Sequence, residues 1–228
     1  MPHHERHLEE STEMYFEALY RLEREGPGVT TSGLATWLGV APGSASGMLR
    51  KLDEEGYVKR IARGEVELTR KGLERAVRVM RRHRLAERLL TDVLGMPWDE
   101  VQNEACMLEH AISDRVEERL LEVLGNPTTC PHGHPIPPRD LSAPERIGEP
   151  LAQAEAGSEA TVRGVTEELP EILRYLGEIG LRPGAHVRIL EKAPLGGPLT
   201  IEVGEKRSAI SLELARMVLV MPGAVALQ

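Results

Sequence analysis

The pattern of apolar and polar positions predicts three helices at the start of the chain. In residues 8–25 apolar side chains recur near a 3.6-residue period, and a Gly-Pro-Gly stretch follows them. A second helix can be capped by Thr30 or Thr31 and ends at Leu38, and a third is predicted at residues 42–55 after a Gly-Val turn. The second and third segments therefore read as helix, turn, helix.

The next segments predict a β-hairpin and a group of longer helices. Residues 57–61 and 66–68 are β-prone runs separated by a turn that contains glycine, which is the pattern of a hairpin. A long basic helix is predicted at residues 69–94, followed after a Gly-Met-Pro break by helices at 98–112 and 113–124. A helix-turn-helix followed by a hairpin is typical of a winged helix.

The second half of the chain predicts a linker and a small β-domain. Residues 126–158 are rich in proline, which blocks both helices and strand ladders. Beyond it a short helix is predicted at 170–179. The β-type segments are residues 160–166, 186–192, 199–203 and 218–221. The fold class predicted is mainly α with a small β part, and a barrel is the simplest way to close these strands.

These elements divide the chain into four parts. We expect a winged helix-turn-helix DNA-binding domain at residues 1–75 and a helical metal-binding and dimerisation domain at 76–140. A linker rich in Pro, Gly and Ala is expected at 141–158, and the β-domain at 159–228.

The net charge becomes informative about DNA binding only when the charged residues are counted separately in the two parts of the chain. The net charge of −8 is unfavourable for a DNA-binding protein, but residues 1–82 carry 14 Lys and Arg against 13 Asp and Glu, whereas residues 83–228 carry 14 against 23. The positive charge is concentrated at residues 50–82, as a phosphate-facing surface requires. Phe, Trp and Tyr together number only seven, which argues against RNA recognition by base stacking.

The apolar stretches and the cysteines indicate the cellular compartment of the protein. No stretch approaches the roughly 20 apolar residues of a membrane helix, and the first residues lack the apolar core of a secretion signal. Cys106 and Cys130 lie in different contexts and are expected to stay reduced. We therefore expect a cytoplasmic protein with no membrane partner.

The third helix predicts the surface that reads double-stranded DNA. Its apolar positions pack against the second helix, and small or hydroxyl residues dominate its outward N-terminal face. This composition favours contacts to phosphates and recognition of DNA shape over contacts to bases. The candidate DNA-binding residues are Ser44, Ser46, Gly47, Arg50, Lys51, Lys59, Arg60 and Arg63.

Two groups of potential metal ligands lie on consecutive predicted helices. Gln102, Cys106, Glu109 and His110 fall at offsets of four, seven and eight residues, which places them on one helical stripe. A thiolate, a carboxylate and an imidazole suit a first-row divalent ion. His83 and Glu87 form a second pair four residues apart. Each group alone is also compatible with an ordinary salt-bridged surface.

The sequence resembles the diphtheria toxin repressor family of iron- and manganese-dependent regulators. The motifs that carry the resemblance are STEMY (11–15), RRHRLAERLL (81–90), DEVQNEACMLEHAISD (99–114) and PHGHPIP (131–137). The C-terminal motifs LRPGAHVRILE and APLGGPLTIEV look like the SH3-like barrel that many members carry.

The resemblance implies two metal sites per subunit. Met14, Cys106, Glu109 and His110 match the primary, activating site, with a backbone carbonyl near Gln102 or Cys106 as a further ligand. His83 and Glu87 match the ancillary site, for which Glu167 looks like the carboxylate donor.

This chain departs from the family pattern at two positions and leaves one cluster outside it. Gln102 stands where the family commonly has His, and Pro170 where it commonly has Gln, so the ancillary site is expected to be weaker or altered. Cys130, His132 and His134 belong to a segment that is a structural loop in the family, and we expect no third metal site there.

The predicted function is a homodimeric transcriptional repressor. It would bind a palindromic operator when loaded with Fe²⁺ or Mn²⁺, with Zn²⁺, Co²⁺ or Ni²⁺ as substitutes, and would control genes of metal homeostasis. One ion joining Met14 to the helix of Cys106 would supply the conformational bias.

The sequence leaves open a second class of function and argues against a third. A metal-independent winged-helix regulator, with a small-molecule effector or none, would use Cys106 and His110 only for packing or salt bridges. A zinc hydrolase needs two His four residues apart and a spare general base, and the sequence has no such motif, no nucleophile and no phosphate loop. We therefore expect no enzymatic activity.

Overall fold

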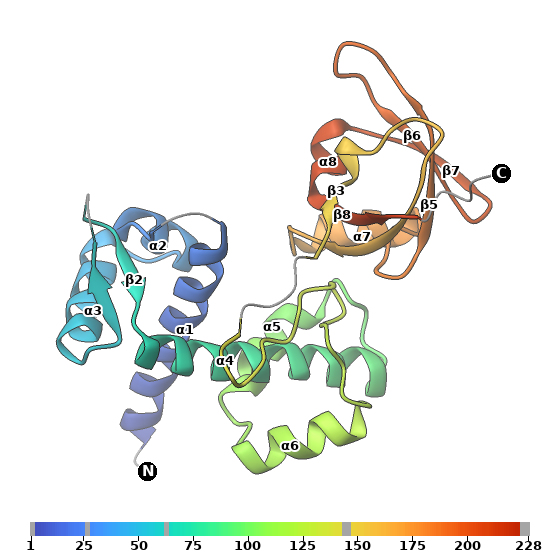
Figure 1. The fold of residues 1–228 in the computed structure, drawn as a ribbon. Helices are drawn as coiled ribbons and strands as arrows, with labels where there is room; N and C mark the ends of the chain where they lie inside the picture. Colours follow the sequence, from blue (N-terminus) through green and yellow to red (C-terminus); the bar gives the residue numbers. More distant parts are fainter. Residues whose placement is uncertain (1–2, 26–27, 62–63, 143–146, 224–228) are drawn as a thin grey trace. The chain divides into compact units, whose positions relative to one another are not determined.

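A computed structural model describes residues 3–25, 28–61, 64–142 and 147–223 (Figure 1). The chain forms two units. The first contains residues 1–83, 108–113 and 137–143, and the second contains residues 84–107, 114–136 and 144–228. Within the described residues, no helix combines the length and apolar character needed to cross a membrane.

The first unit contains the predicted winged helix. Its elements are α1 (His3–Glu25), α2 (Thr31–Leu38), α3 (Pro42–Glu54), β1 (Val58–Arg60), β2 (Val66–Leu68) and the part of α4 (Arg70–Arg88) up to His83. The Thr30 side chain accepts a hydrogen bond from Gly33 N at 3.0 Å and so caps α2. Gly39 ends α2 in a left-handed conformation with φ of 65°. The helix-turn-helix and the hairpin are confirmed.

One apolar core holds these helices to the hairpin. The side chains of α1, α2 and α3 that fill it include Phe16, Leu34 and Leu49, and Phe16 meets Tyr57 edge to face with ring centroids 5.2 Å apart. Gly72 lets α4 approach the start of the hairpin, because a Cβ there would lie 1.9 Å from the carbonyl oxygen of Tyr57. α1, which carries part of the candidate site, is thereby fixed against the DNA-binding elements.

The helices after residue 83 are shorter than the sequence pattern predicted. α4 ends at Arg88 and continues as one wide π-type turn, η2 (Leu89–Val93), in place of regular helix to residue 94. The Thr91 hydroxyl donates to the carbonyl of Glu87 at 3.0 Å, a side-chain contact that accompanies the distortion. α5 (Val101–Glu109) and α6 (Asp114–Val123) follow.

The C-terminal part is a six-stranded antiparallel sheet in the order β3-β8-β4-β5-β6-β7, which curls around a common core in Figure 1. The strands are β3 (Glu149–Pro150), β4 (Glu159–Val165), β5 (His186–Lys192), β6 (Leu199–Val203), β7 (Lys206–Ile210) and β8 (Val218–Pro222), with helices α7 (Pro170–Glu178) and α8 (Leu212–Met217). The predicted fold class is confirmed, while β3, β7 and α8 were not predicted.

The linker is shorter than the predicted range of 141–158. Glu149 pairs with Val220 and Pro150 with Leu219, so that residues 149–150 form an edge strand. A 3₁₀ turn, η3 (Leu151–Gln153), then places Leu151 fully inside the core of the sheet. Two residue pairs with β8 and the packing of Leu151 hold this segment, although its proline content suggested an open linker.

Candidate metal centres and DNA-binding surface

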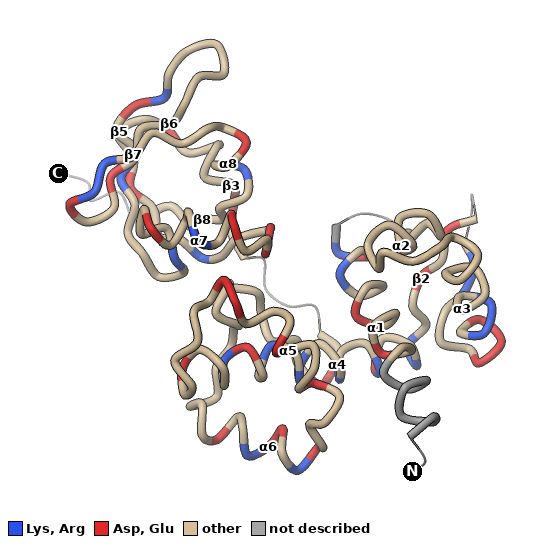
Figure 2. Tube along the Cα trace, turned by 180° about the vertical axis from the view of Figure 1, so that it is seen from behind, with Lys and Arg blue, Asp and Glu red and all other residues tan. Residues whose placement is uncertain are grey.

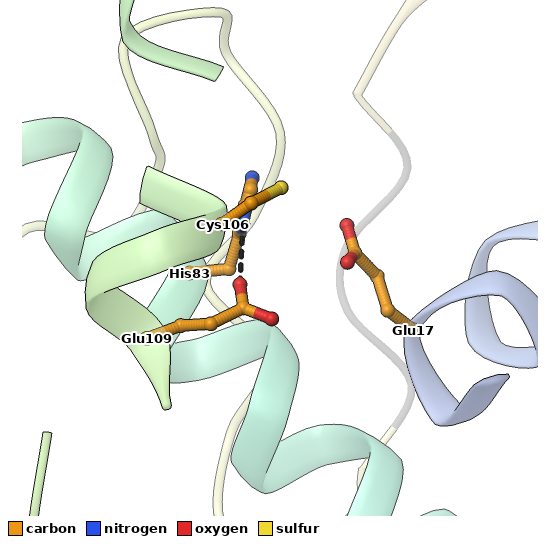
Figure 3. A group of neighbouring side chains, drawn as sticks. All are labelled: Glu17, His83, Cys106 and Glu109. Atoms are coloured by element: carbon orange, nitrogen blue, oxygen red, sulfur yellow. Dashed lines mark hydrogen bonds and ion pairs between the residues drawn. The ribbon is translucent and has the colours of Figure 1, made fainter. Parts of the chain in front are cut away.

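The first cluster of possible metal ligands joins three helices. Glu17 on α1, His83 on α4, and Cys106 and Glu109 on α5 each offer one ligand atom, and these atoms all lie within 4.8 Å of one another. Figure 3 shows the Glu17 carboxylate facing the other three side chains. Two ligands on opposite sides of a first-row ion are about 4–4.6 Å apart, because each bond is about 2.0–2.3 Å long. The cluster therefore has the dimensions of a site for one cation.

The contacts inside this cluster also fit a cation. His83 Nδ1 lies 2.6 Å from Glu109 Oε2, and both side chains are buried. Glu109 Oε1 is buried with no hydrogen-bond partner among the described residues, and His110 Nε2 is 3.6 Å from it. Burial raises the pKa of Glu109 above its usual value. A buried carboxylate oxygen without a donor is stabilised by a positive ion.

An arginine on α1 contacts two members of this cluster. Arg21 Nε lies 3.0 Å from Glu17 Oε1, one helical turn away, and Arg21 Nη2 lies 3.4 Å from His83 Nε2. Only 15% of the Arg21 side chain and 3% of the Glu17 side chain are exposed. The positive charge of the guanidinium group is therefore held close to two candidate ligands.

Two predicted primary ligands take other positions in this structure. Met14 on α1 is 45% exposed. His110 Nδ1 contacts Glu13 Oε2 at 2.7 Å, and Glu13 also pairs with Arg75 at 3.3 Å. The predicted set is thus represented in the cluster by Cys106 and Glu109, while Glu17 and His83 supply the other two groups.

The second cluster lies entirely within the second unit. Glu87 on α4, Cys130, His132 and Glu168 bring their ligand atoms within 4.8 Å of one another. His132 Nδ1 lies 3.1 Å from Glu87 Oε1, 3.8 Å from Glu168 Oε1 and 4.0 Å from Cys130 Sγ. His134 Nε2 is 3.1 Å from the same Glu168 oxygen. Imidazole, thiol and carboxylates again form a mixed set that suits a first-row ion.

Backbone contacts fix the loop that carries Cys130 and His132. His132 Nε2 donates to the carbonyl of Trp98 at 2.7 Å, which directs Nδ1 into the cluster. Val165 N donates to the carbonyl of His132 at 3.1 Å. Gly133, with φ of +91°, allows this approach, because a Cβ there would lie 2.0 Å from the carbonyl oxygen of Arg163. The loop therefore sits directly on β4.

Burial and neighbouring groups shift the pKa values of His132 and Cys130 in the second cluster. Desolvation alone would lower the pKa of His132, but hydrogen bonds to Cys130 and Glu87 and the charge of Glu87 raise it to about 11. Burial and the charge of Glu87 raise the pKa of the Cys130 thiol. A cation entering this cluster has to displace protons from the ring and from the thiol.

The structure distributes the predicted ancillary donors differently from the expectation. His83 and Glu87, expected to share one ion, belong to the first and second clusters respectively. Glu167 is exposed, and its neighbour Glu168 contributes the carboxylate instead. With its amide oriented to donate, Gln102 lies 3.3 Å from Glu87 Oε1 and 3.2 Å from Glu168 Oε2. Gln102 therefore contacts the second cluster as a hydrogen-bond donor.

Pro170 forms the first turn of α7, and its ring has no ligand atom. Four other candidate ligands were either dismissed or missed in the sequence. Cys130 and His132, expected to be purely structural, line the second cluster, and their Cys-x-His spacing was the available signal. For Glu17 and Glu168 the sequence holds no comparable signal, because their partners come from distant segments.

The predicted DNA-binding positions lie at the surface of the first unit. Ser44, Gly47 and Arg50 on α3 are exposed and Ser46 is half-buried. A Cβ at Gly47 would meet nothing within 4 Å, so a DNA backbone could approach α3 closely there. Arg63 lies outside the described residues.

Three predicted phosphate contacts take part in ion pairs within the protein. Lys51 lies 3.9 Å from Glu55, Arg60 lies 3.3 Å from Asp53, and Lys59 pairs with Glu67 across the hairpin. Figure 2 shows Lys and Arg next to Asp and Glu at the end of α3. All of these side chains are exposed, so the pairs are weak and can be exchanged for phosphate contacts.

Comparisons with known proteins match the chain along most of its length. Residues 7–64 match the N-terminal DNA-binding domain of the iron dependent repressors, and residues 69–138 match their metal binding and dimerisation domain. Residues 149–222 match the FeoA domain.

The iron-dependent repressor IdeR of Mycobacterium leprae is 37% identical over 223 residues, which cover 92% of this chain and 96% of that protein. The diphtheria toxin repressor of Corynebacterium efficiens is 36% identical over 197 residues, which cover 81% and 85%. A solved manganese-dependent transcriptional repressor in complex with manganese superposes with a TM-score of 0.84 at 32% identity, over 93% of this chain and 100% of that one.

Proposed function

The chain belongs to the family of iron-dependent repressors, and we propose that it represses transcription when divalent cations occupy the two clusters. The observation that carries the proposal is the first cluster, in which a buried carboxylate oxygen of Glu109 lacks a hydrogen-bond donor among the described residues. The same helix α1 that supplies Glu17 packs against the helix-turn-helix. Occupancy by a cation can therefore affect the DNA-binding elements.

The proposed ligands of the first ion are Glu17, His83, Cys106 and Glu109. Met14 and His110 are proposed as further ligands of this ion. His110 already lies beside Glu109, and Met14 lies one turn before Glu17 on α1. Reorientation of these two side chains would complete a coordination shell that includes the thioether predicted from the sequence.

The proposed ligands of the second ion are Glu87, Cys130, His132 and Glu168, with Gln102 as a hydrogen-bonding neighbour. The supporting observation is the backbone carbonyl of Trp98, which orients His132 as outer contacts commonly orient histidine ligands. Because Glu168 follows β4 and Glu87 lies on α4, this ion would connect the helical part of the second unit to its sheet.

The proposed physiological metal is Fe²⁺, with Mn²⁺ as the close competitor and Zn²⁺, Co²⁺ and Ni²⁺ as substitutes. One thiolate, one imidazole and two carboxylates in each cluster form a set that these borderline ions accept and that Mg²⁺ and Ca²⁺ do not favour. The IdeR relative is described as iron-dependent, the structural neighbour is described as a complex with manganese, and a related structure described as ScaR contains bound Zn²⁺.

The ligands of the first cluster would favour one orientation of the helix-turn-helix. Glu17, His83 and Glu109 would hold the divalent cation, which would offset the negative charge of the two carboxylates. Glu17 would then tie α1, and His83 would tie α4, to the ligands on α5. This arrangement favours one orientation of the helix-turn-helix only if the cation binds it more tightly than the alternative orientation. We propose that this orientation, in a homodimer, matches a palindromic operator.

A gel-shift titration tests the proposal. Binding to the protein's own promoter DNA is measured with Fe²⁺ under anaerobic conditions, with Mn²⁺, with Zn²⁺ and with a chelator. Wild type is expected to need the cation, and His83→Ala to lose the stimulation while keeping its helical content. His186→Ala, which changes an exposed histidine, is the matched control. Equal DNA binding with chelator and with metal would instead favour a metal-independent winged-helix regulator.

A further inference from the structure

Arg21 offers a positive charge to the same atoms that the first metal ion would use. Its guanidinium group contacts Glu17 Oε1 at 3.0 Å and His83 Nε2 at 3.4 Å. We propose that Arg21 is an internal cation that occupies the ligand atoms before metal binding, has to be displaced by the metal, and so sets the metal affinity of the first cluster. This inference rests on the proposed function of that cluster.

The hydrogen-bonding capacity of His83 supports this assignment. A guanidinium group only donates hydrogen bonds, so the Nε2 atom facing Arg21 presents its lone pair. Nδ1 then carries the hydrogen and donates to Glu109 at 2.6 Å. A neutral imidazole binds metal through its lone pair, which here points at Arg21. Metal binding through Nε2 therefore requires the guanidinium group to leave.

The second contact leads to the same conclusion. Glu17 is almost fully buried, and a buried carboxylate without a counter-charge is costly. Arg21 stabilises it in the metal-free protein, and because arginine stays protonated this charge cannot be removed by pH. The metal has to replace an existing ion pair and also meets a like charge nearby. Both effects weaken metal binding and raise the concentration at which the cluster fills.

The effect of replacing Arg21 on metal affinity distinguishes this role from that of a purely structural salt bridge. If Arg21 only held α1 in place, its loss would loosen Glu17 and leave metal binding unchanged or weaker. If Arg21 competes with the metal, its loss strengthens metal binding. The direction of the change in Kd therefore separates the two roles.

The test uses the full-length protein with Cys130→Ser, which leaves Cys106 as the only cysteine. Absorption of a Co²⁺–thiolate bond then reports the first cluster alone. Arg21→Gln is expected to lower the Kd for Co²⁺ by about tenfold, equivalent to about 1.4 kcal/mol. The matched control is Arg24→Gln, an exposed arginine three residues further along α1, and its Kd is expected to be unchanged.

Two further measurements keep the test decisive. Arg21→Lys keeps the charge and is expected to stay within about threefold of the parent Kd, and a full tenfold gain there would contradict the charge argument. The rise in unfolding midpoint caused by Co²⁺ is expected to be larger in Arg21→Gln than in Arg24→Gln. An Arg21→Gln protein that binds Co²⁺ no more tightly than this control would overturn the inference. Absence of a thiolate signal in the parent protein would instead contradict the proposed metal site.

Discussion

Glu109→Gln should make the metal-free protein more stable and the metal-loaded protein less responsive. Glu109 Oε1 is buried without a hydrogen-bond donor among the described residues, and burial raises the pKa of the carboxyl group. A buried unsatisfied polar atom costs about 1–3 kcal/mol. Gln keeps an oxygen that can accept from His83, removes the charge, and puts an amide donor in the place of Oε1, opposite the Glu17 carboxylate that can accept from it. The free energy of unfolding without metal is therefore expected to rise by up to that amount.

The effect on metal binding has the opposite sign. Removing one partner of a buried charge pair costs about 3–5 kcal/mol, which weakens binding by at least about 100-fold. At a metal concentration of about 100 times the wild-type Kd, the metal adds about 2.7 kcal/mol to the stability of wild type. The same concentration would about equal the Kd of Glu109→Gln, and the added stability falls to about 0.4 kcal/mol.

Urea unfolding followed by circular dichroism, with and without Co²⁺ or Mn²⁺, measures both quantities. Cys130→Ser is used as the background, so that the second cluster is impaired in every sample. Glu104→Gln, an exposed position on the same helix, is the control and should change neither value. A Glu109→Gln protein that is less stable without metal, yet gains as much stability from metal as its Cys130→Ser parent, would refute the reasoning.

Three further predictions concern the core, the DNA surface and pH. Trp98 is 4% exposed in the core of the sheet, and Trp98→Ala should lower the free energy of unfolding by about 3–5 kcal/mol in urea titrations, whereas a loss under 1 kcal/mol would contradict the packing. Arg50→Ala should weaken binding to all DNA sequences and reduce the slope of log K against log salt concentration by about 1. Gel shifts at several salt concentrations measure this slope, and an unchanged slope would show that Arg50 does not contact a phosphate. The pKa of Glu109 is raised, so lowering the pH through that value protonates its carboxyl group and Co²⁺ affinity should fall. Over the same pH range the metal-free protein should gain stability relative to Glu109→Gln, because the buried charge is lost. A Co²⁺ affinity that does not depend on pH would contradict this prediction.

Periodicity predicted the elements in which one face is consistently apolar. Strand β5 at His186–Lys192 was predicted with both observed ends, and α1 with its observed C-terminal end at Glu25, although α1 starts at His3 and not at residue 8, because glycine and alternation agree at the predicted ends. Strand β7 was missed because its sequence KRSAI is mostly polar and buries only Ile210 fully. Strand β3 is two residues long and includes a proline, so it has no period to read.

The candidate site was predictable only where its donors share one helix. Cys106 and Glu109 lie three residues apart on α5, and helical geometry alone places them together. Which donors of other segments join them depends on packing between distant parts of the chain. His83 illustrates this, since its spacing to Glu87 suggested one shared ion, while its side chain turns to Glu109. Adjacent positions such as Glu167 and Glu168 cannot be distinguished by spacing in an irregular segment.

Because the loop of His132 packs closely on β4, the second cluster also depends on residues that have no ligand atoms. Besides Gly133, a Cβ at Gly164 would lie 2.9 Å from the carbonyl oxygen of His132. Any larger residue at either glycine would push the loop off the strand and separate His132 from Glu168. Relatives that retain every ligand residue can therefore have lost this cluster through one substitution at an inert position, and a survey of the family has to score these two glycines together with the ligands.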